Sequence, residues 1–571
     1  MALNDSNGRE HPIVQILDAE EGTAPQRKLS DGDSNLSQVT TILEEDERTI
    51  IPSQVVVVAS MRTVQRRLAL GVLTFFVISA FVVSRTMCRA RDCGEGSGSQ
   101  RAQEILRLVN EFSLQASNLT YPPKSHTMPE DQALDFLIQH DALQLSATAD
   151  ASRLLQRYAL AVMWFSNGPW TSDDAEFRSQ DAAKRAWFVG PEECLWTGVS
   201  CEDRKITGIR LESQGAKGTL PLDLALLTGL TSLRLRDNRL TGTIPTFFSE
   251  FSNLKHLDVS VNDLTGPLFP TFLTELTSLA EFSVGWNNLH GSIPNVWTNM
   301  TQLTAFSVGA NSLTGTVPSS FLSELTALTH LGLGGSHLTG TLPQSLGRLT
   351  DLEFLDVSGL EVSAEGAFLP SLSDLRKLTH LSCSQAPTLM DGFSLPSEIG
   401  EWWPEMHVFS VVRTNLVGSI PDSVARWSSL TEFDVSSNAL TGSLPREVYS
   451  SWSELESFDV GWNEFRGIGV PFELGLIWKQ LKVLDIRHNQ FSGPLPTTLS
   501  QLSHLSKFIG TSNRMTGEIP PVFPSYATVW LDSNNFSGTA PFCDGNRRSA
   551  VLTQNRVDCK TVQCDCCVGC T

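Results

Sequence analysis

The tetrapeptide VGWN occurs twice and places Trp286 and Trp462 directly before an asparagine. An exposed tryptophan can stack on the face of a sugar ring or fill a pocket in a partner protein. The alternative is that each indole ring only covers the neighbouring strand. We include both tryptophans in a candidate ligand-binding set.

Cationic side chains occur at related positions. Arg234 and Arg236 lie in one segment, Arg487 and His488 in another, and Arg413 occupies the same position as the two tryptophans. A guanidinium group can bind a carboxylate or phosphate through two parallel hydrogen bonds. We add these five residues to the candidate set. The alternative is that they pair with neighbouring aspartates of an acidic surface.

Catalytic motifs are not found in the sequence. It has no G-x-S-x-G elbow, no H-E-x-x-H pair and no P-loop, and its eleven histidines are scattered. We therefore predict that the protein is not an enzyme and that it uses no metal or cofactor.

The candidate residues belong to a pattern that recurs along the chain. Its consensus is L-x-x-L-x-L-x-x-N-x-L-x-G-x-[IL]-P, and most copies are 24 to 26 residues apart. A period of this length is typical of a solenoid in which each copy stacks on the next. The asparagine slot is filled in fourteen copies by Gln214, Asn238, Asn262, Asn287, Asn311, Ser336, Leu360, Ala386, Thr414, Asn438, Asn463, Asn489, Asn513 and Asn534.

Each position of the pattern has a physical role. In L-x-L the apolar side chains have the period of a β-strand, so they point inward and the x residues point outward. We expect the asparagine to turn inside and to bond backbone groups, which would give a ladder of amides along the stack. L-x-G predicts a tight second turn, and I-P predicts an extended segment on the far side.

The segments LTGTIP, LHGSIP, LVGSIP and MTGEIP resemble the plant-type leucine-rich repeat of plant receptor kinases and polygalacturonase-inhibiting proteins. Upstream, ECLWTGVSCEDRKITGIRL resembles the C-x-W-x-G-V-x-C cap that opens such arrays. RLLQRYALAVMWFSNGPWTS is similar to the helical lead-in of leucine-rich-repeat membrane proteins that are numerous in diatoms. The resemblance covers residues 131–571. It implies an α/β solenoid, a horseshoe of about fourteen repeats with a binding surface, but no particular ligand.

The resemblance also implies that Cys194 and Cys201 form a disulfide in the cap. The aspartates between the strand leucines are ordinary in this repeat, so we expect them to bind no calcium. Disulfides are predicted to close the other end of the array, with a zinc cluster in CDCCVGC as the alternative. Six cysteines are available there, in the last 29 residues: Cys543, Cys559, Cys564, Cys566, Cys567 and Cys570.

Three consecutive copies depart from the consensus near the middle of the array. Their asparagine slots hold Leu360, Ala386 and Thr414, and one copy contains the pair Trp402 and Trp403. Two interpretations are open. The copies form a protruding island or hinge that contacts a partner, or they show drift in a solenoid that tolerates a few poor copies.

An apolar segment precedes the repeats. Residues 68–84 carry no charge, and a helix of this length spans about 25 Å. A buried core helix is the alternative, but nothing nearby could cover a segment that is apolar on all faces. We predict an uncleaved signal anchor.

Sequons and cysteines give the expected orientation. Asn118, Asn299 and Asn535, as glycosylation acceptors, and all eleven cysteines follow the apolar segment, which suits an oxidising compartment. We predict a plasma-membrane protein with its N-terminus in the cytoplasm. The predicted domains are a disordered acidic tail (1–67), a transmembrane helix (68–84), a stalk with short helices (85–150), a helical cap (151–203), the solenoid (204–542) and a cysteine-rich tail (543–571).

The overall charge argues against nucleic-acid binding, and the tail sequence argues against a protein kinase. The formal charge is −20, without a basic block that could neutralise phosphates, so nucleic acid is an improbable partner. The tail has none of the protein-kinase motifs. The predicted function is therefore single-pass membrane recognition of a peptide, protein or glycan on the concave face, with a co-receptor for any signal. The alternatives are a cell-surface adhesion or wall-associated structural protein, and a tethered inhibitor of extracellular hydrolases.

Overall fold

The computed structural model describes residues 98–116, 128–141, 143–168, 192–268, 275–295, 300–364, 366–521, 523, 527–539, 557 and 562–563. The chain divides into two units, Met1–Gln100 and Arg101–Thr571, and the repeats lie in the second. The predicted tail and the apolar segment 68–84 lie outside the described residues. None of the described helices is both long and apolar enough to cross a membrane.

The strand segments of the repeats form one continuous sheet of 15 strands. The first two strands are antiparallel, and from β2 onward each strand is parallel to its neighbours, one strand per copy. In most strands only the middle residue is buried, so the flanking residues face outward as predicted. The strands are β1 (Val199–Glu202), β2 (Lys205–Arg210), β4 (Ser232–Arg234), β6 (His256–Asp258), β8 (Glu281–Ser283), β10 (Ala305–Ser307), β12 (His330–Gly332), β14 (Phe354–Asp356), β16 (His380–Ser382), β17 (Val408–Ser410), β19 (Glu432–Asp434), β21 (Ser457–Asp459), β23 (Val483–Asp485), β25 (Lys507–Ile509) and β27 (Thr528–Trp530).

The L-x-G segments form further strands rather than the predicted turns. Their glycines, such as Gly242 with φ +85°, take a left-handed conformation, while the leucine before them stays in the core. Two seven-stranded sheets result. One contains β3 (Lys217–Gly218), β5 (Arg239–Gly242), β7 (Asp263–Pro267), β9 (Asn288–Gly291), β11 (Ser312–Gly315), β13 (His337–Leu342) and β15 (Glu361–Ala364); the other contains β18 (Val417–Gly418), β20 (Ala439–Gly442), β22 (Glu464–Ile468), β24 (Gln490–Gly493), β26 (Arg514–Glu518), β28 (Asn535–Thr539) and β29 (Val562–Gln563).

A single turn of helix follows the I-P segment in most copies. Pro245 itself is extended, with φ −69° and ψ 140°, and the helical turn begins at the next residue. The prediction of an extended far side was therefore wrong beyond the proline. These turns are η5 (Leu222–Leu226), η6 (Thr246–Glu250), α5 (Ser319–Glu324), η8 (Gln344–Arg348), α6 (Phe368–Ser371), α7 (Ile399–Trp402), η9 (Asp422–Arg426), α8 (Val448–Ser451), α9 (Leu474–Ile477) and η10 (Thr497–Gln501).

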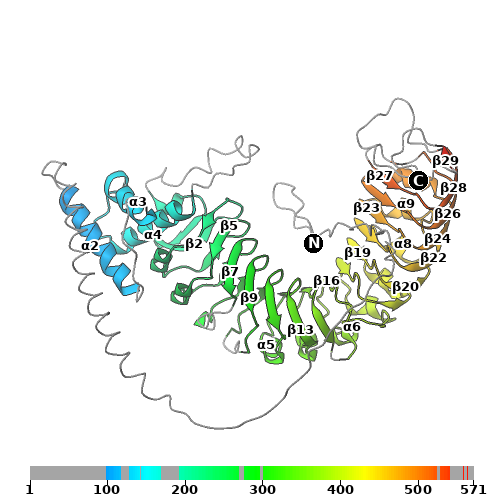
Figure 1. Cartoon of the computed structure of the whole chain (residues 1–571), viewed down its shortest axis with the longest axis horizontal. Coiled ribbons are helices and arrows are strands. Elements are labelled where there is room, and N and C mark those ends of the chain that lie inside the picture. The colour runs from blue at the N-terminus through cyan, green and yellow to red at the C-terminus, as the bar shows by residue number, and fades with distance from the viewer. Residues whose placement is uncertain are drawn as a thin grey trace, which may run out of the picture. The chain divides into compact units, whose positions relative to one another are not determined.

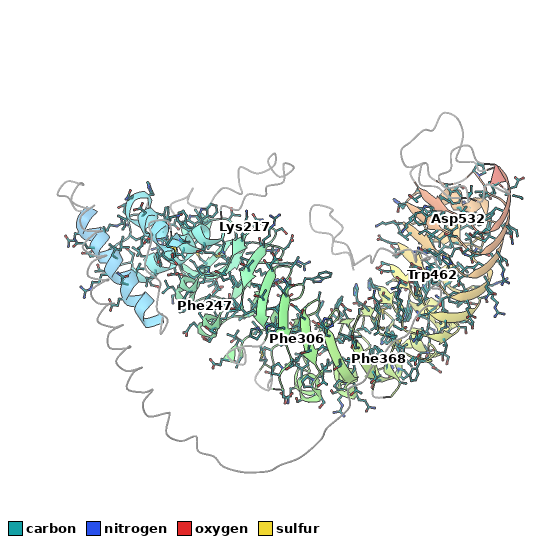
Figure 2. All side chains as sticks on the ribbon, viewed as in Figure 1. Lys217, Phe247, Phe306, Phe368, Trp462 and Asp532 are labelled. Atoms are coloured by element: carbon teal, nitrogen blue, oxygen red, sulfur yellow. A yellow bond between two sulfur atoms is a disulfide. The ribbon has the colours of Figure 1, made fainter. Side chains whose placement is uncertain are left out.

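The stack of repeats is curved. Figure 1 shows β16 and β19 on the inner side of the curve, and α5 and α6 on the outer side. The leucines and phenylalanines between these layers form one continuous core. Figure 2 shows the side chains that fill it, among them Phe306, which is fully buried. The long sheet therefore provides the concave face of the solenoid.

The predicted ladder of asparagine amides is present. Asn262 donates its amide N–H groups to the carbonyls of Leu235 and Val259, at 3.0 and 3.1 Å. Its Oδ1 accepts the backbone N–H of Leu240 at 2.9 Å. Each such asparagine thus joins its own copy to the preceding one and satisfies backbone groups that no sheet neighbour reaches.

Helix α4 covers the first copy. The Gln156 side chain accepts the backbone N–H of Ile206 at 2.6 Å, and Asn167 donates to the carbonyls of Lys217 and Thr219 at 2.7 and 3.0 Å. Helix α4 therefore bonds to β2 of the long sheet, whose edge strand is β1, and to the open edge of the first short sheet at β3. The N-terminal elements are α2 (Gly98–Ala116), α3 (Pro129–Asp135), the π-helical turn η1 (Phe136–His140), α4 (Ala151–Asn167) and the 3₁₀ turn η4 (Glu193–Leu195).

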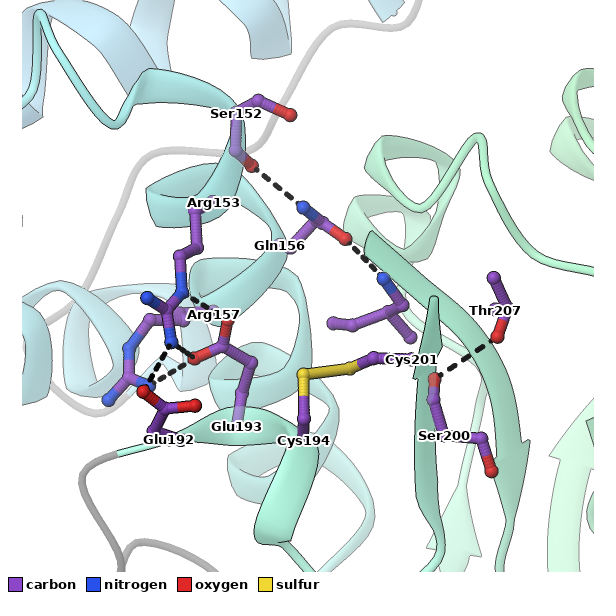
Figure 3. The surroundings of a disulfide bond; sticks show 11 residues. Ser152, Arg153, Gln156, Arg157, Glu192, Glu193, Cys194, Ser200, Cys201 and Thr207 are labelled. Atoms are coloured by element: carbon purple, nitrogen blue, oxygen red, sulfur yellow. Dashed lines mark hydrogen bonds and ion pairs between the residues drawn. A yellow bond between two sulfur atoms is a disulfide. The ribbon is translucent and has the colours of Figure 1, made fainter. Parts of the chain in front are cut away.

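A disulfide joins η4 to β1, and a buried ion network attaches η4 to α4. Cys194 and Cys201 are joined by a disulfide (Figure 3). The fully buried Arg157 contacts Asp141 and Glu193, each at 2.6 Å, and Arg153 contacts Glu193 at 2.5 Å. Burial opposes ionisation of Glu193, but its bonds to the two arginines outweigh burial, so its pKa is lowered.

The structure describes some of the remaining predicted cysteine and glycan sites and not others. Asn118, Asn299 and the six C-terminal cysteines lie outside the described residues. Asn535 is exposed on β28. Cys383 is fully buried as a free thiol in the core, as its place in the L-x-L pattern requires.

Candidate functional site

The residue before the asparagine slot has a left-handed backbone in all fourteen copies. Its φ is +57° at Trp286, +55° at Arg413 and +55° at Trp462. This conformation reverses the chain at the end of the strand, so that the next side chain, the asparagine, points into the core. The side chain before it is left on the concave rim, where Trp286 is 54% exposed and Trp462 is 48% exposed.

The two tryptophans have different surroundings. Trp462 stacks on His488 of the next copy, with ring centroids 3.6 Å apart (Trp462 is labelled in Figure 2). Trp286 is followed in the same column by residues with little or no side chain. Its backbone N–H bonds the carbonyl of Gly309, and the next residues of the column are Ala310, Gly335 and Gly359. The surface next to Trp286 in this column therefore has no large side chains.

Small residues also cover the adjoining part of the concave face. The third strand position is small in five of the six central strands of the long sheet, from β8 to β17, and Asp356 is the exception. The resulting floor has few side chains that could obstruct a bound chain. Its small residues are Ser283, Ser307, Gly332, Ser382 and Ser410.

The predicted cationic residues are mostly engaged with acids. Arg234 forms two hydrogen bonds to Glu281, which lies two copies further and also contacts His256 at 3.2 Å. Arg487 contacts Asp485 of its own copy at 3.0 Å. For these two arginines the structure agrees with pairing to neighbouring acids rather than with a free anion site.

The other predicted cations are more accessible. Arg413 is exposed and lies in the tryptophan column, and Arg236 is partly exposed. His488 is occupied by its stack with Trp462. The candidate residues therefore share the concave face but are not gathered into a single pocket.

Three aspartates lie side by side on neighbouring strands of this face. Asp434, Asp459 and Asp485 are directly paired in the strand register. Each accepts a backbone N–H from the second residue after it, yet burial raises the pKa of all three, to about 6 for Asp434. Within the described ranges no group of three or more acidic, histidine or cysteine side chains is placed to hold a metal ion.

A row of aromatic rings lies at the start of four central strands and was missed in the sequence. His330, Phe354 and His380 are directly paired in the strand register, and the His407 ring stacks on that of His380. The sequence analysis considered the columns before the asparagine slot and between the strand leucines. Aligning the residues just before L-x-L would have revealed three of the four rings.

The irregular copies do not form a protruding island around the tryptophan pair. Trp403 is fully buried, stacks on Trp427 at 6.5 Å and donates its ring N–H to the carbonyl of Leu372 at 3.2 Å. Trp402 is partly buried against the same core. The long sheet continues through these copies, whereas the short strands are interrupted between β15 and β18.

Comparison with known proteins supports the repeat type. Two family models described as leucine rich repeat match residues 228–289 and 480–502. Receptor-like protein 18 of Arabidopsis thaliana is 30% identical over 192 residues, which are 33% of this chain and 22% of that protein. Receptor-like protein 53 of the same plant is 30% identical over 218 residues, or 34% of this chain and 21% of that protein. The matches thus span about a fifth of the length of these two relatives.

Solved structures share the fold. The crystal structure of a TDR receptor has a TM-score of 0.51 at 26% identity and covers 61% of this chain and 64% of that chain. The ectodomain of the Arabidopsis receptor kinase HAESA, solved with a peptide hormone ligand, has a TM-score of 0.51 at 24% identity and covers 72% and 74% of the two chains. The chain therefore has the leucine-rich-repeat fold, and its repeats are similar to those of plant receptor-like proteins.

Proposed function

We propose that the protein is a recognition protein that binds an extended ligand, in the first place a peptide, along the concave face between Trp286 and Trp462. The observation that carries this proposal is the pair of exposed tryptophans that lie on either side of the central strands β10 to β17, where small residues form most of the floor. A wide surface built from stacked copies suits an extended chain better than a compact small molecule.

Backbone strain supports a binding role for the two tryptophans. A residue other than glycine in the left-handed region costs about 1–2 kcal/mol. Other copies place serine, glycine or alanine at the same position, so the fold does not require a large side chain there. Rigid aromatic anchors are typical of the residues that contribute most to binding. A peptide is the ligand class favoured here because the HAESA ectodomain, which has this fold, was solved with one.

We also propose that the repeats lie outside a membrane, anchored through the segment 68–84, with the N-terminal tail in the cytoplasm. The disulfide between Cys194 and Cys201 supports an oxidising compartment for the repeats. Any signal would then require a co-receptor, because the tail sequence contains no kinase motif.

Binding is tested with the full chain reconstituted in lipid nanodiscs. A phage-displayed peptide library and an array of cell-wall oligosaccharides are presented separately, and the affinity of captured ligands is measured by surface plasmon resonance. The variant Trp286→Ala with Trp462→Ala is expected to lose at least about tenfold in affinity for captured peptides, since hot-spot aromatics contribute 2 kcal/mol or more.

Phe472→Ala is the matched control, because Phe472 is a 57% exposed aromatic in the turn that leads to α9, away from the strands of the concave face. It should bind as the unmodified chain does. Equal capture by the tryptophan variant would show that the ligand does not lie between Trp286 and Trp462. Capture of oligosaccharides alone would favour the adhesion alternative.

A further inference from the structure

The aromatic row on the concave face consists of His330, Phe354, His380 and His407. Successive ring centroids are 5.9, 5.9 and 6.0 Å apart, and the last two rings are nearly parallel, at 5°. The four rings come from four consecutive copies; His330 stacks on Phe354 and His380 on His407, while Phe354 and His380 are tilted by 38°. They therefore form a contact that runs along the stack rather than within one copy.

The same four copies lack the asparagine ladder. Their slots hold Ser336, Leu360, Ala386 and Thr414, whereas Asn311 just before them bonds the carbonyls of two successive copies. The Ser336 hydroxyl is buried without a hydrogen-bond partner. The short strands are also interrupted here, between β15 and β18. At the centre of the array the asparagine ladder is thus replaced by other bonds between copies, such as Ser384 to Ser410, and the ring row adds a contact on the concave side.

Hydrogen bonds fix where each imidazole carries its proton. The Thr379 hydroxyl donates to the carbonyl of Glu353 at 2.9 Å, so it accepts the Nδ1–H of His380 at 2.7 Å. Thr329 bonds His330 in the same way. His407 Nδ1 lies 2.7 Å from the carbonyl of Glu405, which can only accept. All three neutral rings therefore leave Nε2 to take up a further proton.

The surroundings of the row disfavour that further proton. Burial, and then the neighbouring rings of His407 and His330, lower the pKa of His380 to about 4. In the described part of the chain no carboxylate side chain is hydrogen-bonded to a ring of the row. The charged residues within three positions of the strands on these copies are Lys377 beside His380 itself, Asp351, Glu353 and Asp356 on the preceding copy, Glu405 and Arg413 on the next, and Glu432 and Asp434 one copy further.

We propose that this ring row is an acid-sensitive switch, which holds the four central copies together while its imidazoles are neutral and releases them when the imidazoles are protonated. Protonation places like charges on adjacent stacked rings, where they repel one another, and forces a charge on the half-buried His380. The central copies lack the asparagine amides; serine hydroxyls bond across them instead, Ser358 to Ser382 at 2.7 Å and Ser384 to Ser410 at 3.1 Å. The flanking copies keep their amides and stay closed.

The direction with pH follows from linkage. The unfolded chain has an ordinary histidine pKa of about 6.5, so between about pH 6.5 and 4 it binds more protons at His380 than the folded chain does. Stability of the central copies therefore falls as the pH drops through this window. Above the window His380 is neutral in both states, so its contribution to stability does not change with pH.

The test is hydrogen exchange with mass spectrometry on the full chain in nanodiscs, at about pH 7.5 and pH 4.5, with intrinsic rates corrected for pH. Acid is expected to lower the protection of amides in β12, β14, β16 and β17 at least about tenfold more than that of amides in β6 and β23. A uniform change along the array, or none, would overturn the proposal.

His380→Phe is the decisive variant, because Phe354 shows that a phenyl ring fits the row. In this variant acid should lower amide protection in the central copies no more than in β6 and β23. His504→Phe is the matched control, since His504 is exposed outside the row, and it should leave the response unchanged. Should His380→Phe fail to fold, histidine-selective NMR of the unmodified chain decides. Titration of His380 near pH 4 supports the switch, and titration near about 6.5, as in a free histidine, contradicts it.

Discussion

At the residue scale, the left-handed position before the asparagine slot carries both strain and variation. Glycine fills it in two copies, and Trp286, Arg413 and Trp462 are among the residues that fill it elsewhere. Val261 is the one β-branched residue among them, with φ +55°. A β-branched side chain is rarely found in this region, because its two Cβ substituents clash with the backbone.

Replacing Val261 by asparagine should therefore stabilise the protein. Asparagine tolerates the left-handed region, so the free energy of unfolding is expected to rise by about 1 kcal/mol in urea denaturation. Val412→Asn is the control, because Val412 lies on the same face without a positive φ. A gain in the control as large as in Val261→Asn would show that the effect comes from polarity rather than strain.

At the element scale, the asparagine amide connects one copy to the next. Asn287 accepts the N–H of Leu264 at 2.9 Å and donates to the carbonyls of Val259 and Val284, both at 3.0 Å. All of these groups are buried, so an empty slot leaves backbone atoms without partners. The adjacent Asn288 is exposed on β9 and lies outside the asparagine ladder.

Asn287→Ala is thus expected to cost about 2–3 kcal/mol, which is the usual penalty for leaving buried polar groups unsatisfied. Asn288→Ala should change stability by no more than about 0.5 kcal/mol. Equal effects of the two substitutions, measured by chemical denaturation, would refute the assigned role of the ladder. The central copies have no asparagine in this slot, and there the row of four aromatic rings provides another contact between copies.

At the scale of the whole molecule, every copy rests on its neighbours, so the ends of the stack need a cover. The N-terminal cover depends on Arg157, which is 1% exposed and lies between two fully buried carboxylates, Asp141 and Glu193. The same arginine also faces the ring of Trp196 at 5.0 Å. Removing one charge from such a group leaves the others unpaired in the interior.

Arg157→Met should consequently destabilise the cap by about 3–5 kcal/mol. Hydrogen exchange is expected to increase first in β2 and β3, which α4 covers, and only weakly at the far end. Arg210→Met is the control, because Arg210 is exposed and its contact to Glu212 is a surface pair worth at most about 1 kcal/mol. Unchanged exchange in β2 in the Arg157 variant would contradict this account.

The sequence by itself determined the period, the buried leucines, the inward asparagines and the outward concave residues. These features depend only on one copy and its immediate neighbour at a fixed spacing, so a repeated pattern is enough to predict them. The strand in L-x-G was missed for a related reason. A glycine with positive φ is compatible with a turn or a strand end, and only the adjacent copy provides the partner that makes it a strand.

Only the tertiary structure decided how residues of different copies meet. The pairing of Arg234 with Glu281 spans two copies, the burial of Trp403 depends on Trp427 of the next copy, and the four-ring row spans four copies. Such contacts depend on the curvature and stagger of the stack. Those follow from the summed packing of all copies, which no single copy encodes.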